Sequence, residues 1–277
     1  MVPALELRGM TRTFGGSWSN RDAVHAVRGV DVTLQPGQIV ALVGQSGSGK
    51  TTLGRMAALL EPSTAGSIRI AGQDATRLRG APLRAARRNL QMVFQDPFDS
   101  IDSRQTVFQV VEGCLLQTGV AARARRKRAV DALESVGLDT SEGWLGRYPH
   151  QLSGGQRQRL AIARALVLEP AVLVADEPVS MLDVSVRAGI LRLFDRIRTE
   201  RGTACLFITH DLAVARYVSD EIHVMFEGEV VERGDTEQLI ANPQHEYTKL
   251  LLSSAPELER VAVPSFGPVQ HSPNEGV

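Results

Sequence analysis

The sequence predicts an α/β protein built around a parallel β-sheet. Three short apolar runs, at residues 39–43, 172–175 and 206–208, have the length and composition of buried strands. Helical patterns separate them, as expected for strands joined by crossover helices. All three runs end in chemically active residues, and the carboxyl ends of parallel strands form the ligand edge of such a sheet. We therefore expect one active site along one sheet edge.

Strand-like segments surround this core on its N-terminal side. Residues 5–34 and 67–71 have the pattern of short strands, with turn signals at Gly15-Gly16, Pro36-Gly37 and Gly72. We expect these strands to form an antiparallel sheet on one side of the core.

A helical segment interrupts the core. Residues from about 97 to 158 contain no strong strand pattern, and the helix expected at 121–136 stops at Gly137. The composition of this segment differs from that of its flanks, so we predict an inserted α-helical subdomain within one domain of residues 1–255. Beyond that domain Pro, Ser and Gly accumulate and periodicity disappears, so we expect residues 256–277 to be a disordered tail.

The first strand leads into a glycine-rich loop suited to binding phosphate. Glycine lets successive backbone N–H groups turn toward an anion, and the following helix adds its positive N-terminal end. We expect Lys50 to reach the β- and γ-phosphates of a nucleoside triphosphate and the Thr51 hydroxyl to ligate Mg²⁺. The alternative is a tight strand-to-helix turn without a ligand. The residues assigned to the nucleotide are Gly44, Gln45, Ser46, Gly47, Ser48, Gly49, Lys50, Thr51 and Thr52.

A carboxylate pair, Asp176 and Glu177, follows the second strand. Asp176 suits a Mg²⁺ role, usually through water, and Glu177 is placed to polarise the attacking water. A positioned general base contributes about 10²- to 10⁴-fold in rate. Taken alone, Asp-Glu-Pro also suits a solvated acidic turn, but the phosphate loop and the preceding strand favour the catalytic interpretation.

Three more polar side chains follow the predicted strands. Gln95 comes after an apolar segment at 91–94, and its amide could touch both the metal and the attacking water. His210 follows the third strand and could hydrogen-bond the γ-phosphate. Asp183, taken alone, is an N-cap for the helix expected at 186–194. A lone Gln or His is usually structural, so the catalytic assignments depend on their shared sheet edge.

A second glycine motif lies far downstream of the first. Ser153 can cap the helix expected at 160–168, and the following glycines permit close phosphate approach. Its separation from Lys50 disfavours contact with the same phosphate within one chain. We therefore expect two half-sites, completed when a second chain is arranged head-to-tail. The residues expected to cross to the partner's γ-phosphate are Ser153, Gly154, Gly155 and Gln156.

Composition restricts the function classes. The formal net charge is zero, so no global field indicates a nucleic-acid binder. Cys114 and Cys205 match no metal-site spacing, and we expect buried thiols in a reducing compartment. No apolar run reaches the ~18 residues of a membrane helix, and residues 1–10 lack a signal-peptide pattern. We therefore expect a protein in the cytoplasm or bound peripherally to the cytoplasmic face of the cell membrane, with other chains supplying any membrane spans.

In combination, these motifs resemble the ATP-binding cassette (ABC) ATPases. The resemblance covers residues 5–240 and rests on the order of phosphate loop, glutamine, Leu-Ser-Gly-Gly-Gln, carboxylate pair, aspartate and histidine. It implies a RecA-like parallel core with an antiparallel β subdomain and an inserted α-helical subdomain, and two subunits that sandwich two ATP molecules. It also implies that Asp183 lies at the nucleotide. Phe14 stands where many members have a tyrosine that stacks on adenine.

Narrower motifs resemble the dipeptide/oligopeptide importer branch, which also includes nickel importers. They comprise residues 94–97, 148–151, 176–180 and 242–248, and the branch implies a C-terminal segment of its own type at about 235–255. The implied partners are two transmembrane permeases, a second and related ABC ATPase subunit, and an extracytoplasmic solute-binding protein. Residues 100–103 depart from the usual pattern, which indicates a specialised permease-coupling surface.

The alternative is a soluble ABC ATPase that acts in macromolecular assembly or nucleic-acid processing. Five basic residues at 123–128 are compatible with a nucleic-acid patch. Zero net charge and the lack of interleaved aromatic residues favour a solvated helix face or contact with anionic lipid headgroups. We therefore expect no nucleic-acid partner, and uptake of di- or oligopeptides through the partner permeases. The transported solute and the direction of transport stay open at this point.

Overall fold

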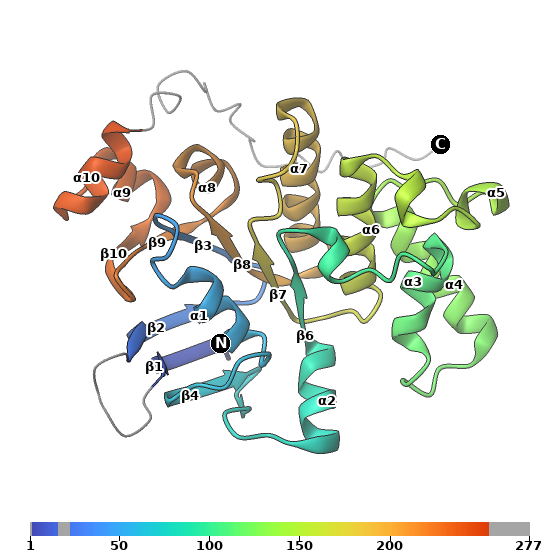
Figure 1. Ribbon diagram of the computed structural model, residues 1–277, viewed down its shortest axis with the longest axis horizontal. Coiled ribbons are helices and arrows are strands. Elements are labelled where there is room, and N and C mark those ends of the chain that lie inside the picture. Colours follow the sequence, from blue (N-terminus) through green and yellow to red (C-terminus); the bar gives the residue numbers. More distant parts are fainter. Residues whose placement is uncertain (1, 16–22, 255–277) are drawn as a thin grey trace, which may run out of the picture.

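The computed structural model describes residues 2–15 and 23–254 (Figure 1). Within them the strands form a six-stranded sheet in the order β10-β9-β3-β8-β7-β6 and a four-stranded sheet in the order β2-β1-β4-β5. Helices cover both faces of the larger sheet, and the predicted α/β class is confirmed. The tail expected at residues 256–277 lies outside the described residues.

The six-stranded sheet is parallel except at one edge. β3, β6, β7, β8 and β9 run parallel, and β10 pairs antiparallel with β9. Every residue of the three predicted strands is buried, which explains their continuous apolar sequences. The strands are β3 (Ile39–Val43), β6 (Leu90–Val93), β7 (Val172–Asp176), β8 (Ala204–Thr209), β9 (Glu221–Phe226) and β10 (Glu229–Asp235).

The four-stranded sheet is antiparallel and lies below the core in Figure 1. Its first two strands are longer than the short strands that the pattern predicts, and part of the turn expected at Gly15-Gly16 falls outside the described residues. The side chains of this sheet share a buried cluster with one face of the parallel sheet and with α1. The strands are β1 (Leu5–Phe14), β2 (Val24–Leu34), β4 (Ala65–Ile70) and β5 (Gln73–Asp74).

The helix α1 (Lys50–Ala57) follows the phosphate loop and packs on β7 and β8. It ends at Ala57, and Leu59 just beyond it has a left-handed backbone with φ of 58°. The carbonyl oxygen of Leu59 accepts a hydrogen bond from the Arg87 guanidinium at 2.6 Å.

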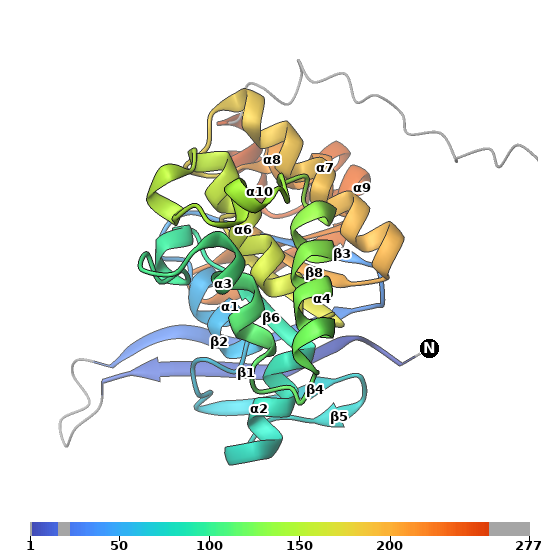
Figure 2. The same ribbon diagram turned by 90° about the vertical axis from the view of Figure 1, so that its right-hand side faces the viewer.

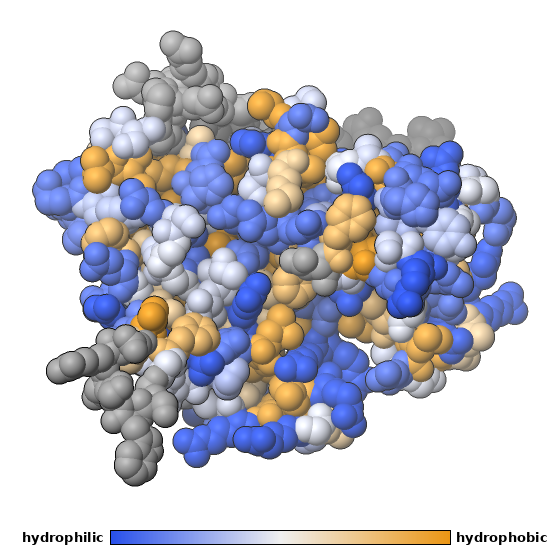
Figure 3. Space-filling model, in the orientation of Figure 1, coloured by the Kyte–Doolittle hydropathy of each residue, from blue (hydrophilic) through white to orange (hydrophobic). Residues whose placement is uncertain are grey.

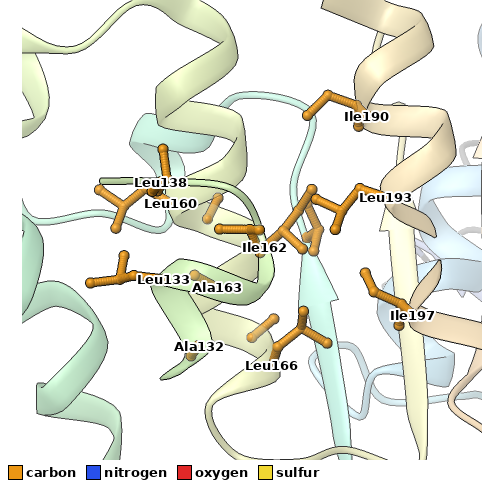
Figure 4. Packing of buried hydrophobic residues seen from close by; sticks show 14 of the residues in the cluster. Ala132, Leu133, Leu138, Leu160, Ile162, Ala163, Leu166, Ile190, Leu193 and Ile197 are labelled. Carbon is orange, nitrogen blue, oxygen red and sulfur yellow. The ribbon is translucent and has the colours of Figure 1, made fainter. Parts of the chain in front are cut away.

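A helical region forms the right-hand part of Figure 1, and Figure 2 shows its helices from the front. The helix predicted at 121–136 is present, and Gly137 ends it with φ of +73°. Figure 4 shows Leu133, Ile162 and Leu193 converging from three different helices into one apolar core. The helices here are η1 (Pro97–Asp99), α3 (Val107–Glu112), η2 (Gly113–Leu115), α4 (Ala122–Ser135), α5 (Glu142–Leu145), η3 (Pro149–Gln151), α6 (Gly154–Leu166) and α7 (Val184–Arg201), whereas α2 (Gly80–Asn89) lies apart from them and packs on β6.

Three C-terminal helices pack beside β3 and β9 around a third buried cluster. They are α8 (Leu212–Val218), α9 (Thr236–Ala241) and α10 (Glu246–Ser253). In the described part of the chain, none of the helices combines the length and apolarity needed to cross a bilayer. Hydrophilic and hydrophobic side chains are interspersed over the face seen in Figure 3. Both cysteines are free; Cys205 is buried, as predicted, but Cys114 is only partly buried.

Candidate active site

A pocket of about 650 Å³ lies at the carboxyl ends of the parallel strands, where the sequence predicts it. Its walls come from residues spread over most of the chain. All of them except Ala26 and Leu251 are predicted site residues. The lining residues are Ala26, Gln45, Ser46, Gly47, Gly49, Lys50, Thr51, Thr52, Gln95, Glu177, His210 and Leu251.

Two glycines let the phosphate loop lie against neighbouring backbone. A Cβ on Gly44 would lie 2.1 Å from the Met225 carbonyl oxygen, and one on Gly49 would lie 2.2 Å from the Ala26 carbonyl oxygen. Gly49 also has φ of 102° at the start of α1. Larger side chains at either position would displace the loop from the sheet.

Lys50 lies under the loop and is only 5% exposed. Its ammonium group donates hydrogen bonds to the carbonyl oxygens of Gly44 at 2.6 Å and Gln45 at 2.8 Å. Burial lowers the pKa of Lys50, and the charges of Glu177 and Asp176 act in the opposite direction. The ammonium is thus positioned by the loop itself, at the wall of the pocket that a phosphate would enter.

The Thr51 hydroxyl donates to Oδ1 of Asp176 at 3.1 Å, so the helix and β7 meet at this point. Asp176 is almost fully buried, and burial raises its pKa; the neighbouring Glu177 charge adds to this effect, while the Thr51 hydrogen bond opposes it. A hydroxyl and a carboxylate so close together form a set of hard oxygen donors, which is the donor type that Mg²⁺ prefers.

Glu177 is oriented from two sides. Gln95 donates from Nε2 to Oε2 of Glu177 at 3.2 Å, and Nδ1 of His210 lies 3.1 Å from Oε1. The Glu177 backbone is left-handed, with φ of 45°, and its N–H donates to the Ile208 carbonyl at 2.9 Å. Such a conformation in a non-glycine residue costs of order 1 kcal/mol and is held here by the neighbouring strand. The structure therefore brings the predicted carboxylate, amide and imidazole together.

The second glycine motif lies outside this pocket in the described structure. Ser153 and Gln156 form a capping box at the start of α6, which confirms the predicted cap. A Cβ on Gly155 would lie 2.5 Å from Val186 in α7, so this glycine also permits close helix packing. Asp183 is the N-cap residue of α7, but its side chain makes no capping hydrogen bond within the described residues.

Phe14 lies at the end of β1 and is not among the described residues that line the pocket. Its ring is 38% exposed, and the Arg12 guanidinium lies 4.4 Å from the ring centroid. Ala26 and Leu251 line the pocket but carry no sequence signal that distinguishes them from ordinary apolar positions.

A family model described as "ABC transporter" matches residues 27–180, more than half of the chain. The chain belongs to the ABC transporter family. A second model, "Oligopeptide/dipeptide transporter, C-terminal region", matches residues 231–274 of this ABC transporter protein.

Curated relatives of this ABC transporter chain include the dipeptide transport ATP-binding protein DppF of Escherichia coli, strain K12. It is 42% identical over 259 residues, which cover 93% of this chain and 77% of DppF. The glutathione import ATP-binding protein GsiA of Salmonella choleraesuis is 43% identical over 276 residues, covering 98% of this chain but 43% of GsiA.

Solved structures of ABC cassettes share the fold. The ATP-binding cassette MJ0796, as a dimer in a post-hydrolysis state bound to ADP and Pi, superposes with a TM-score of 0.74 at 30% identity, covering 84% of this chain and 98% of that one. The cbiO1 subunit of Clostridium perfringens, part of the ABC transporter complex cbiONQ, has a TM-score of 0.76 at 28% identity, covering 87% and 92%. The predicted ABC ATPase fold is confirmed, and the activity is ATP hydrolysis coupled to transport.

Proposed function

We propose that this ABC transporter chain is the ATP-hydrolysing subunit of an importer for di- or oligopeptides. Its pocket has the groups that ATP hydrolysis needs, and relatives that are 42–43% identical have names that include dipeptide transport and glutathione import. The match of residues 231–274 to a C-terminal region of oligopeptide and dipeptide transporters supports the same substrate class. These relatives do not favour the alternative of a soluble assembly ATPase.

The roles in hydrolysis follow from the contacts around Glu177. Its carboxylate is the general base for the attacking water, because it faces the pocket between Gln95 and His210. Those two side chains fix its orientation and remain within reach of the water and the γ-phosphate. Lys50 leaves its loop carbonyls to neutralise the phosphates, and the loop N–H groups hold them. The contacts of Glu177 with Gln95 and His210 are the main structural support for the proposed ATP hydrolysis.

Mg²⁺ fits the Thr51 hydroxyl and the Asp176 carboxylate, with the amide oxygen of Gln95 as a further donor. Magnesium sites commonly use one or two carboxylates together with substrate phosphates. The bound ion supplies charge neutralisation on the phosphates and so favours attack by water.

A second cassette completes the site. The second glycine motif and the exposed Asp183 lie away from the pocket, where they can contact the nucleotide of a head-to-tail partner. The residues of the motif are Ser153, Gly154, Gly155 and Gln156. The assembly comprises a related ATPase chain, two permeases and a solute-binding protein, with this chain peripheral at the cytoplasmic face of the membrane.

We assign residues 1–255 to the ATPase domain, about 97–158 to its helical subdomain and about 235–255 to the importer-type segment. We also assign Phe14 to stacking on the adenine ring.

The test is affinity purification of this chain from native membranes in detergent with Mg²⁺ and ATP, followed by mass spectrometry. We expect two permeases, a second cassette ATPase and a solute-binding protein. The same preparation should then show ATP hydrolysis that increases when the binding protein and peptides are added. Recovery of soluble proteins or nucleic acid alone would remove the transporter assignment.

A further inference from the structure

The C-terminal helix α10 contacts the phosphate loop directly. The backbone N–H of Gln45 donates a hydrogen bond to the Tyr247 hydroxyl at 2.9 Å, across 202 residues of sequence. Gln45 lines the pocket, and Tyr247 lies in the segment matched by the oligopeptide/dipeptide C-terminal model. The segment matched by the oligopeptide/dipeptide model therefore contacts and supports the phosphate loop of the nucleotide site.

Tyr247 is itself firmly held. It is 7% exposed, and its ring packs against Phe226 at the end of β9 with centroids 4.3 Å apart. Immediately before α10, the Glu232 carboxylate accepts the backbone N–H groups of Gln244 at 2.8 Å and His245 at 3.0 Å. The hydroxyl thus has a fixed position from which it can hold the loop.

A single residue, Gln45, connects the Tyr247 contact to Lys50. While the N–H of Gln45 donates to Tyr247, the carbonyl of Gln45 accepts a hydrogen bond from Nζ of Lys50 at 2.8 Å. The same residue is therefore fixed from outside by α10 and from inside by the lysine. Farther along the loop, the Ser48 carbonyl accepts the Gly228 N–H at 3.0 Å, which provides a second external anchor.

Helix α10 also supplies part of the pocket wall. Leu251 comes four residues after Tyr247, so both side chains lie on one face of the helix. Leu251 lines the pocket and packs against the same buried cluster as Tyr247. The neighbouring Leu250 points away and is 56% exposed.

We propose that Tyr247 is a positioning residue for ATP binding, acting through Gln45 on the phosphate loop and Lys50, and that Leu251 is a nucleotide-binding wall residue. Helix α10 is then an integral part of the ATP site. This inference rests on the proposed function, because it takes ATP to be the occupant of the pocket.

The test compares Tyr247→Phe with Tyr217→Phe in the full-length chain. Both variants remove one phenolic hydroxyl from a C-terminal helix, but Tyr217 packs against the cluster that contains α6 and α7. A hydrogen bond of ordinary strength predicts that Tyr247→Phe raises the Kd for Mg-ATP roughly 2- to 12-fold. Hydrogen exchange at Gln45 should accelerate, while the exchange of the rest of α10 stays at wild-type values.

A second pair of variants, Leu251→Ala and Leu250→Ala, distinguishes direct contact of the pocket wall with ATP from positioning of the phosphate loop. Leu251→Ala should weaken Mg-ATP binding without changing exchange at Gln45, whereas Leu250→Ala should do neither. Unchanged ATP affinity and unchanged Gln45 exchange in a folded Tyr247→Phe variant would overturn the positioning role. Lys50→Ala serves as the reference: if the wild type binds no ATP and Lys50→Ala changes nothing, the proposed function fails. If only the Tyr247 and Leu251 effects are missing, this inference alone fails.

Discussion

Nδ1 of His210 lies 3.1 Å from Oε1 of Glu177, while Gln95 donates to the other oxygen of the same carboxylate. The three residues come from the ends of three different strands, and no two of them are neighbours in sequence. A carboxylate held by partners on both oxygens has little freedom to rotate, so its direction toward the pocket is fixed before ATP enters.

The first prediction concerns the base itself. Glu177→Gln keeps the shape of the side chain but replaces one acceptor oxygen with an N–H donor group, and it cannot accept a proton from water. We expect ATP binding to persist, a closed dimer to accumulate, and turnover to fall about 10²- to 10⁴-fold. Phosphate release and size-exclusion chromatography with ATP measure the two effects. Glu200→Gln, an exposed glutamate on α7, is the matched control, and rapid hydrolysis by Glu177→Gln would remove Glu177 from this role.

The second prediction concerns Lys50. Removing a buried ammonium that faces the phosphates should weaken nucleotide affinity itself, roughly 10- to 100-fold for a charge-assisted hydrogen bond. Titration of Lys50→Ala with a fluorescent ATP analogue measures the change. Lys127→Ala, at an exposed lysine of α4, should bind like the wild type. Equal affinities for all three proteins would contradict the phosphate-loop assignment.

The third prediction follows from the raised pKa of Asp176, which burial causes. The pKa of Asp176 is higher in the folded chain than in the unfolded chain. At pH values between the two, the folded state binds more protons, so the contribution of Asp176 to the free energy of unfolding falls as pH rises. Asn has no such titration and still accepts from Thr51. Without Mg²⁺ or nucleotide, Asp176→Asn should therefore have a higher Tm than the wild type at neutral pH, with the gain shrinking toward about pH 4.

Thermal unfolding across that pH range tests the sign of the effect. Asp131→Asn, at an exposed position of α4, controls for the loss of one negative charge. A lower Tm for Asp176→Asn at neutral pH would contradict the prediction, because the buried Asp176 charge would then stabilise the folded state instead of destabilising it.

The fourth prediction concerns the apolar core in Figure 4. Ile162 in α6 is fully buried between helices and the sheet. Ile162→Ala should lower the free energy of unfolding by about 2–5 kcal/mol through lost transfer energy and the cavity left behind. Leu116→Ala, where the side chain is 60% exposed, should change it by less than about 0.5 kcal/mol. Urea denaturation of both variants makes the comparison, and equal midpoints would contradict it.

Much of the fold and site could be predicted because the signals are local. Buried parallel strands have continuous apolar sequences. The phosphate loop directly follows one of them, and Asp176 and Glu177 lie at the end of another. The capping box at Ser153 and the end of α4 at Gly137 are likewise set by residues a few positions apart. Strand order then brings His210 and Gln95 to the same edge.

The features of the fold and site that could not be predicted depend on contacts between segments that are distant in sequence. Nothing near Tyr247 indicates that its hydroxyl holds Gln45, and nothing near Gly155 indicates that Val186 leaves no space for a side chain there. Ala26 and Leu251 look like ordinary apolar positions until the sheets assemble. The left-handed backbone of Leu59, just after α1, likewise has no signal in the local sequence.

The order of strands in the central sheet has a consequence for synthesis on the ribosome. Among the described strands β3 pairs with β8 and β9 alone, and β8 begins 161 residues (204 − 43) after β3 ends. At about 5–20 residues per second, the strand that carries the phosphate loop waits roughly 8 to 32 s for its first partner. During that time its apolar side chains are exposed and its backbone N–H and C=O groups are free to pair with other nascent chains. Soluble yield during expression and the stability of the finished protein are therefore separate properties of this chain.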